Sequence, residues 1–209
     1  MIGIVKEKRK LWMPVLLMAV FALTRWPGLM PPNFSAAYAL AFCAGVYFPR
    51  IVAWWLPLTT LLVTDVAMNL FYYQTSPVDD RMMVNYLAYG AIIFLGRRFK
   101  PQTGWLALLA GGLAGAVLFY LVTNTASWLM DPAYPKTLLG WIQSLTVGTP
   151  GWPHTWEFFR NTLLSGGLFT GLFAGAMKLG DPVEAAEEEE EPEGEAQPEP
   201  EEAPEESRP

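Results

Sequence analysis

Residues 104–130 read GWLALLAGGLAGAVLFYLVTNTASWLM and contain no charged side chain. A helix of about 20 apolar residues crosses the hydrocarbon core of a bilayer, so this stretch is predicted to be a transmembrane helix. The chain of 209 residues has the same character, with 52% hydrophobic and only 16% charged residues. Soluble domains average about 25% charged residues. The composition therefore predicts an integral membrane protein.

Five further apolar runs accompany this stretch, which predicts an all-α fold: a polytopic membrane protein with a bundle of six transmembrane helices. The predicted spans are residues 10–26, 35–49, 51–71, 82–97, 104–130 and 158–178. The second and the fourth are shorter than the usual range of about 17–25 residues. They can cross only within a bundle, and the second can instead be a re-entrant segment.

Basic residues near the span ends indicate the orientation, because cytoplasmic loops of membrane proteins are enriched in Lys and Arg. Nine basic residues lie on one side of the predicted bundle, and the other side has Arg25, Arg81, Lys136 and Arg160. Both termini are therefore predicted to be cytoplasmic.

Charge and composition divide the chain into three predicted regions. A basic cytoplasmic N-terminus (1–9) precedes the six-span domain (10–180), and an acidic cytoplasmic tail (181–209) follows it. The tail contains 14 acidic residues. Its Glu-, Pro- and Ala-rich composition offers too little apolar surface to fold, so it is predicted to be disordered.

The last outer loop is predicted to contain a short helix. Asp131-Pro132 and the Pro- and Gly-rich run 148–153 break the chain on either side of it. Between these breaks, apolar residues recur at helical spacing: Leu138, Leu139, Trp141, Ile142 and Leu145. Such a helix lies in the membrane interface or covers the bundle as a lid.

Polar residues gather toward the outer ends of the predicted spans. Polar and ionisable groups inside a bilayer are costly and commonly face a bundle interior or a cavity. Several of them share a helical face at four-residue spacing, as Asp65 and Asn69 do. The predicted substrate-binding residues are Asn33, Asp65, Asn69, Asn85, Tyr89, Tyr120, Asn124, Trp128 and Asn161.

This set favours recognition of a small heteroaromatic or amide-bearing solute. Amides and hydroxyls give directional hydrogen bonds, aromatic rings give stacking faces, and the one carboxylate gives charge. Each group also has a structural alternative. An intramembrane Asn often bonds a neighbouring helix, and Asp65 can form an ion pair with Arg81 or Arg160.

The sequence favours binding over catalysis. Ser127 and Ser165 have no evident His–Asp partner, and the single His154 lies in a Pro-rich loop. With one Cys, Cys43, and one His, the chain offers little for a metal site. We therefore expect no enzyme activity, no cofactor, no metal and no nucleic-acid partner. The expected partners are the lipid bilayer and a small-molecule solute.

Three stripes of small residues mark helix faces that can approach a neighbour closely. They are Ala37, Ala41 and Gly45; Ala107, Gly111 and Gly115; and Gly167, Gly171 and Gly175. They either pack helices within this bundle or form a docking face for another membrane subunit. The second reading supports an alternative function, a structural or assembly protein packed against a larger membrane complex.

Several of these segments resemble the motifs of a bacterial family of uncharacterised six-span membrane proteins. The matching segments, within residues 25–180, are Pro31-Pro32-Asn33-Phe34-Ser35, Gly45-Val46-Tyr47-Phe48, Asp65, Val122-Thr123-Asn124 with Trp128, Tyr134-Pro135-Lys136-Thr137 and Asn161-Thr162-Leu163-Leu164. That family is in turn distantly similar to the substrate-binding S components of energy-coupling factor (ECF) vitamin transporters.

The resemblance implies a subunit of the bacterial cytoplasmic membrane that captures a vitamin-like molecule from outside. It also implies a transmembrane coupling subunit and cytoplasmic ATPases as partners. In this expectation the solute binds between the outer ends of spans three to six, and the loop with Trp141 closes over it. The sequence departs from the S components in the first span, where Ala19 and Ala22 are three residues apart rather than four. It departs from the bacterial family at Gly166-Gly167, where that family has an acidic residue.

Overall fold

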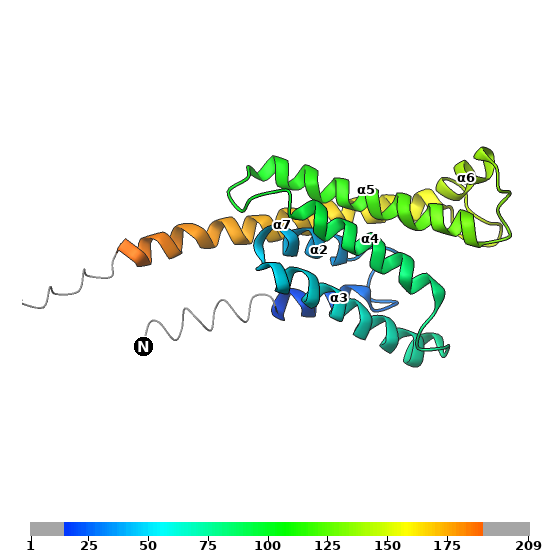
Figure 1. The fold of residues 1–209 in the computed structure, drawn as a ribbon, viewed down its shortest axis with the longest axis horizontal. Coiled ribbons are helices and arrows are strands. Elements are labelled where there is room, and N and C mark those ends of the chain that lie inside the picture. Colours follow the sequence, from blue (N-terminus) through cyan, green and yellow to red (C-terminus); the bar gives the residue numbers. More distant parts are fainter. Residues whose placement is uncertain (1–14, 190–209) are drawn as a thin grey trace, which may run out of the picture. The chain divides into compact units, whose positions relative to one another are not determined.

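The computed structural model describes residues 15–189, and this part is built from helices (Figure 1). An apolar helix, Val15–Arg25, comes first. It is followed by α2 (Ala37–Tyr47), α3 (Arg50–Ala67), the π-helix η1 (Met68–Tyr73), α4 (Asp80–Gly96), α5 (Trp105–Met130), α6 (Leu138–Leu145) and α7 (Thr155–Glu189). The chain divides into two compact units after Ala176, and the packing described below is that of the first unit.

The boundaries of the predicted regions fall partly outside the described residues. The predicted N-terminal region 1–9, the start of the first predicted span and residues 190–209 of the acidic segment lie outside them. α7 continues to Glu189, past the predicted end of the sixth span at 178. Glu and Ala are strong helix formers, so the helix extends into the first part of the acidic segment that we predicted to be disordered.

Each predicted span contains a helix, which confirms the all-helical fold for the described part, but the helices differ in length. α3 with η1 (24 residues) and α5 (26 residues) are the two described helices that are long and apolar enough to cross a membrane. The helices Val15–Arg25, Ala37–Tyr47 and Arg81–Gly96 are apolar but shorter. Six crossings and their orientation stay predictions.

α2 is the buried centre of the first unit. Ten of its eleven residues are buried, and α3, α4 and α5 pack around it (Figure 1). At a rise of about 1.5 Å per residue, a helix of this length covers about half of the hydrocarbon core of a bilayer. The apolar run 35–49 is therefore a short central helix, which explains why it is apolar on every face.

Glycine allows α2 and α4 to approach closely. A Cβ at Gly45 would overlap the carbonyl oxygen of Ile93, and a Cβ at Gly96 would overlap that of Phe42. A glycine of the predicted α5 stripe also lies against neighbours within this unit, because a Cβ at Gly111 would overlap the rings of Phe42 and Phe99. Two of the three predicted small-residue stripes thus pack helices inside the bundle.

The chain changes helix type at the end of α3. Residues 68–73 form η1, and π-helical segments occur frequently at functional sites. Gln74 ends η1 in the left-handed conformation, with a φ of 53°. Asp79 then caps α4, since its Oδ1 accepts a hydrogen bond of 3.0 Å from the backbone N–H of Met82. This end of the bundle holds the polar cavities described below.

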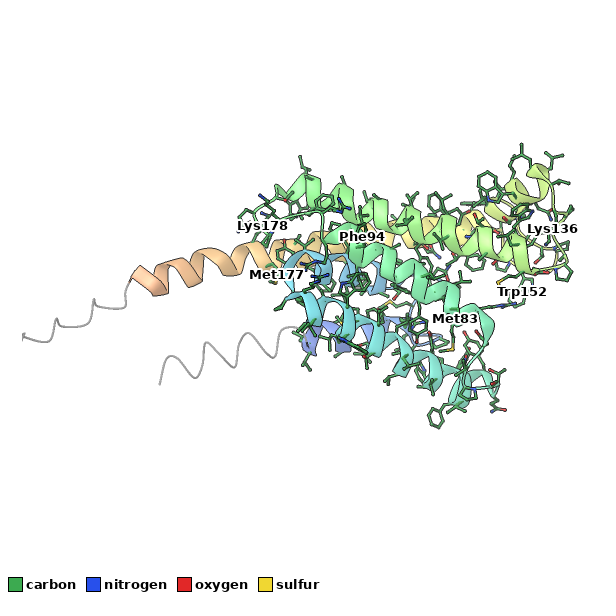
Figure 2. The ribbon with its side chains drawn as sticks, viewed as in Figure 1. Met83, Phe94, Lys136, Trp152, Met177 and Lys178 are labelled. Carbon is green, nitrogen blue, oxygen red and sulfur yellow. The ribbon has the colours of Figure 1, made fainter. Side chains whose placement is uncertain are left out.

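The predicted short helix in the last loop is confirmed as α6, which packs on α5 (Figure 1). The Thr137 hydroxyl caps α6 by accepting a hydrogen bond of 3.2 Å from the N–H of Gly140. The indole N–H of Trp141 donates to the hydroxyl of Thr125 on α5 at 2.9 Å. Lys136, just before α6, is labelled beside this helix in Figure 2.

Candidate functional site

A cavity of about 540 Å³ lies between the segment 26–36, η1, α4 and α5. We call it the inner cavity. Its volume is within the range of about 300–1,000 Å³ that is usual for small-molecule sites. The segment 26–36 contributes Trp26, Met30, Pro32, Asn33 and Phe34 to its lining, so we call this segment the cover.

Aromatic rings form one wall of the inner cavity. Tyr38 of α2 and Tyr89 of α4 are stacked, with an interplanar angle of 7° and ring centroids 6.1 Å apart. Phe119 of α5 contacts both rings, with centroid distances of 4.8 Å to Tyr38 and 5.1 Å to Tyr89. Three helices thus bring together rings that are far apart in the sequence. The wall offers flat apolar surface to a bound molecule.

Two polar groups on α4, the Asn85 amide and the hydroxyl of the wall residue Tyr89, make no hydrogen bond to any described residue. Asn85 and Tyr89 both line the inner cavity and are one helical turn apart. Tyr89 is only 4% exposed, and Asn85 is half-buried. Buried polar groups are normally hydrogen-bonded. An uncommitted amide and an uncommitted hydroxyl beside an aromatic wall are therefore available to a ligand.

Asn33 is the third predicted binding residue that lines the inner cavity, after Asn85 and Tyr89. It lies in the cover and adopts a left-handed conformation, with a φ of 59°. Asn tolerates this conformation better than most residues. Its backbone carbonyl accepts a hydrogen bond of 3.3 Å from the Tyr38 hydroxyl. The side-chain amide of Asn33 has no hydrogen bond to a described residue.

Asp65 does not line the inner cavity but pairs with a residue that does. Its Oδ1 accepts a hydrogen bond of 2.5 Å from Nη2 of Arg25, with side-chain exposures of 7% for Asp65 and 13% for Arg25. The Asp65 partners named in the sequence analysis, Arg81 and Arg160, are thus replaced by Arg25. Nη1 of Arg25 also donates to the Thr64 hydroxyl at 2.6 Å.

Arg25 was missed as a site residue because its position at a span end indicates only topology. A sequence signal for its role was present in the lone acid of the apolar spans, Asp65, which needs a buried cation as a partner. The second carboxylate oxygen of Asp65, Oδ2, is buried without a hydrogen bond. Which of the basic residues meets Asp65 depends on how the first helix packs on α3.

Asn69 has a structural role in the described fold. Its side-chain N–H donates to the carbonyl of Pro77 at 3.3 Å and points at the sulfur of Met82 at 4.0 Å. These contacts hold the turn between η1 and α4. Asn69 is therefore absent from the lining of the inner cavity.

The three predicted binding residues on α5, Tyr120, Asn124 and Trp128, make hydrogen bonds within α5 or to residues 135–145 and do not line the inner cavity. The Tyr120 hydroxyl donates to the carbonyl of Leu145. The Asn124 side chain donates to the Tyr120 carbonyl at 2.8 Å, and the Trp128 indole donates to the carbonyl of Pro135 at 2.9 Å. These groups already have partners, and none of the three residues lines the inner cavity.

The cover is fastened at its middle and at its base. Asn161 of α7 donates from its side chain to the carbonyl of Pro32 at 2.9 Å. At the base, the Thr24 hydroxyl accepts a hydrogen bond of 3.0 Å from the backbone N–H of Ala36. The ninth predicted residue, Asn161, thus holds the cover instead of lining the cavity.

An outer cavity of about 720 Å³ adjoins the inner one. The two share Asn85 and Thr123, so these side chains stand between them. Charged residues of both signs line the outer cavity: Asp79, Arg81 and Asp131. Among the described residues, no group of three or more His, Cys, Asp or Glu side chains is placed to hold a metal ion.

Comparison with known proteins gives one match. The model of a family of unknown function matches residues 5–187. No curated protein and no solved structure matches the chain. The match therefore includes all but the last two described residues, with the inner cavity and its cover, and the family assigns no chemistry to them.

Proposed function

The chain belongs to DUF6580, a family of unknown function. From the inner cavity, we propose that the protein is a membrane subunit that binds a small molecule for transport. The observation that carries this proposal is the pair of uncommitted polar groups, Asn85 and Tyr89, beside the aromatic wall. Both groups can hydrogen-bond a molecule bound in the cavity.

The surface of the helices supports a membrane location. Only 28% of the apolar window of α3 with η1, and 33% of that of α5, is buried inside the bundle. A core helix of a soluble protein would be mostly buried. Large apolar side chains also face outward on other helices, such as Met83 and Phe94 on α4, labelled in Figure 2 (68% and 53% exposed). Apolar side chains exposed to this extent on several helices support a surface that faces lipid.

We base the transport role on the distant similarity of the bacterial family named in the sequence analysis to the S components of ECF transporters. In this proposal the protein lies in the bacterial cytoplasmic membrane with both termini in the cytoplasm. The inner cavity opens toward the outside, and the cover closes it. A transmembrane coupling subunit with cytoplasmic ATPases would drive release. Because residues of the cover line the inner cavity and none of α6 does, we assign the closing role to the cover and not to α6.

A binding experiment tests this function. The full chain is purified in a mild detergent and screened by thermal shift against a library of small vitamin-like molecules, and the affinity of any hit is measured by calorimetry. Asn85→Ala should weaken a hit by about 2- to 12-fold, the value of one lost hydrogen bond. Asn124→Ala is the matched control, because its amide is committed to the Tyr120 carbonyl. Equal effects of the two variants, or no hit at all, would contradict the proposal.

The alternative function, assembly into a larger membrane complex, is favoured by a different observation. An apolar groove of about 670 Å³ runs between α5 and α7 and includes Gly167, Gly171, Leu109 and Leu113. A Cβ at Gly171 would meet its nearest neighbour, a Trp105 ring atom, only at 3.6 Å. This stripe lines a surface groove, whereas Gly45 and Gly111 of the other two stripes are buried against neighbouring residues. If assembly is the function, Gly171→Leu should abolish co-purification of a membrane partner, while Asn85→Ala should not.

A further inference from the structure

Arg25 is the one charged side chain among the described residues that line the inner cavity, and no Asp or Glu is among them. Asp65 neutralises it from outside the lining. The described residues of the lining therefore carry a net positive charge. Such a wall disfavours a cationic solute and favours a negatively charged or strongly electron-rich group.

Arg25 also keeps hydrogen-bonding capacity for a ligand. Its Nη1 donates to Thr64 and to the carbonyl of Leu61, and its Nη2 donates to Asp65. A guanidinium has more N–H donors than these three acceptors use, and its Nε–H has no acceptor among the described residues. The contacts that do exist hold the guanidinium in place. A preorganised, partly desolvated guanidinium binds a carboxylate strongly.

We propose that the solute of the inner cavity is an aromatic carboxylate. The carboxylate accepts hydrogen bonds from Arg25, and the ring packs on the wall of Tyr38, Tyr89 and Phe119. Asn85, which lines both cavities, then binds a polar substituent of the solute on the side of the inner cavity that adjoins the outer one. This inference rests on the proposed function and names the class of molecule that the same site takes.

Matched pairs of probes test the charge requirement. Binding of 2-naphthoate and 2-naphthamide, and of benzoate and benzamide, to the full chain in mild detergent is measured by calorimetry. Each pair has the same rings and differs in the charge of one group. We expect the carboxylate of each pair to bind tighter by about tenfold or more, the factor of one charge-assisted hydrogen bond.

Two variants test whether Arg25 is the origin of the preference for the carboxylate. The double variant Arg25→Gln/Asp65→Asn removes both charges together, so it leaves no unpaired buried ion. It should bind the acid and the amide of a pair equally. Arg98→Gln removes a cation that lies over the Phe94 ring, 4.7 Å from its centroid, and lines neither cavity, so the preference should persist.

Three outcomes would overturn the inference. If the amides bind as tightly as the acids, the solute is neutral, and the proposed binding function stands without this class. If neither carboxylate binds while other molecules do, the class is wrong. If vesicles of phosphatidylglycerol stabilise the protein and both carboxylates fail, the anion belongs to a lipid headgroup. Failure of every small molecule would instead contradict the proposed function itself.

Discussion

The ion pair between Arg25 and Asp65 gives the sharpest stability prediction. Both side chains are almost buried, 13% and 7% exposed. Removing one partner of a buried pair leaves an uncompensated charge and costs about 3–5 kcal/mol. We therefore expect Asp65→Asn and Arg25→Gln each to lower the free energy of unfolding by that amount. For the second variant the cost is reinforced, because Oδ2 of Asp65 already has no hydrogen bond.

The double variant Arg25→Gln/Asp65→Asn should be more stable than either single variant. Both charges are gone, and the two amide side chains can still bond each other, so a loss within about 2 kcal/mol of the unmodified protein is expected. Additive effects of independent sites would instead sum to about 6–10 kcal/mol. The difference is the coupling energy of the pair.

The assay for this cycle is unfolding of detergent-purified protein by dodecyl sulfate, followed by far-UV circular dichroism. Arg98→Gln is the control for loss of an exposed cation. If the single variants do not accumulate but the double variant does, the prediction also holds. A double variant less stable than both singles, or singles within about 0.5 kcal/mol of the unmodified protein, would refute the reasoning.

Three further predictions concern the cover and the packing. Asn161→Ala removes the side-chain bond that fastens the cover, so solute dissociation measured by stopped-flow fluorescence should quicken about 2- to 12-fold, and an unchanged rate would contradict this. Gly45→Ala should cost about 1–3 kcal/mol by overpacking against α4, whereas Gly175→Ala, with open space around it, should be neutral or slightly stabilising in the same unfolding assay. Trp141→Phe should loosen α6 by breaking the bond to Thr125. Protease cleavage in residues 131–154 should then increase with no change in solute affinity, and a change in affinity would return α6 to the role of lid.

The apolar pattern of the sequence was sufficient to locate the helices. Every predicted span contains one, and the helix between the two Pro-rich breaks is α6. The number of crossings was beyond this reasoning, because hydrophobicity alone does not distinguish a lipid-facing helix from a buried one. α2 illustrates this limit, because its apolar residues are buried against other helices of the protein and do not face lipid.

The candidate site was predictable only in part. Four-residue spacing correctly placed Asn85 and Tyr89 on one face, and both line the inner cavity. The same reasoning applied equally to Tyr120 and Asn124, which bond within α5 and to α6 instead. Spacing shows that two side chains share a face, but it does not show which neighbour that face meets.

The sequence by itself determined the helical fold, the positions of the helices and the rarity of charge among them, because these depend on local hydrophobicity and backbone preferences. The tertiary structure alone decided that Arg25 meets Asp65 and that residues 26–36 cover a cavity. It also decided which amides remain without partners. These properties depend on contacts between segments far apart in the chain, and such contacts are set by how the helices pack around α2.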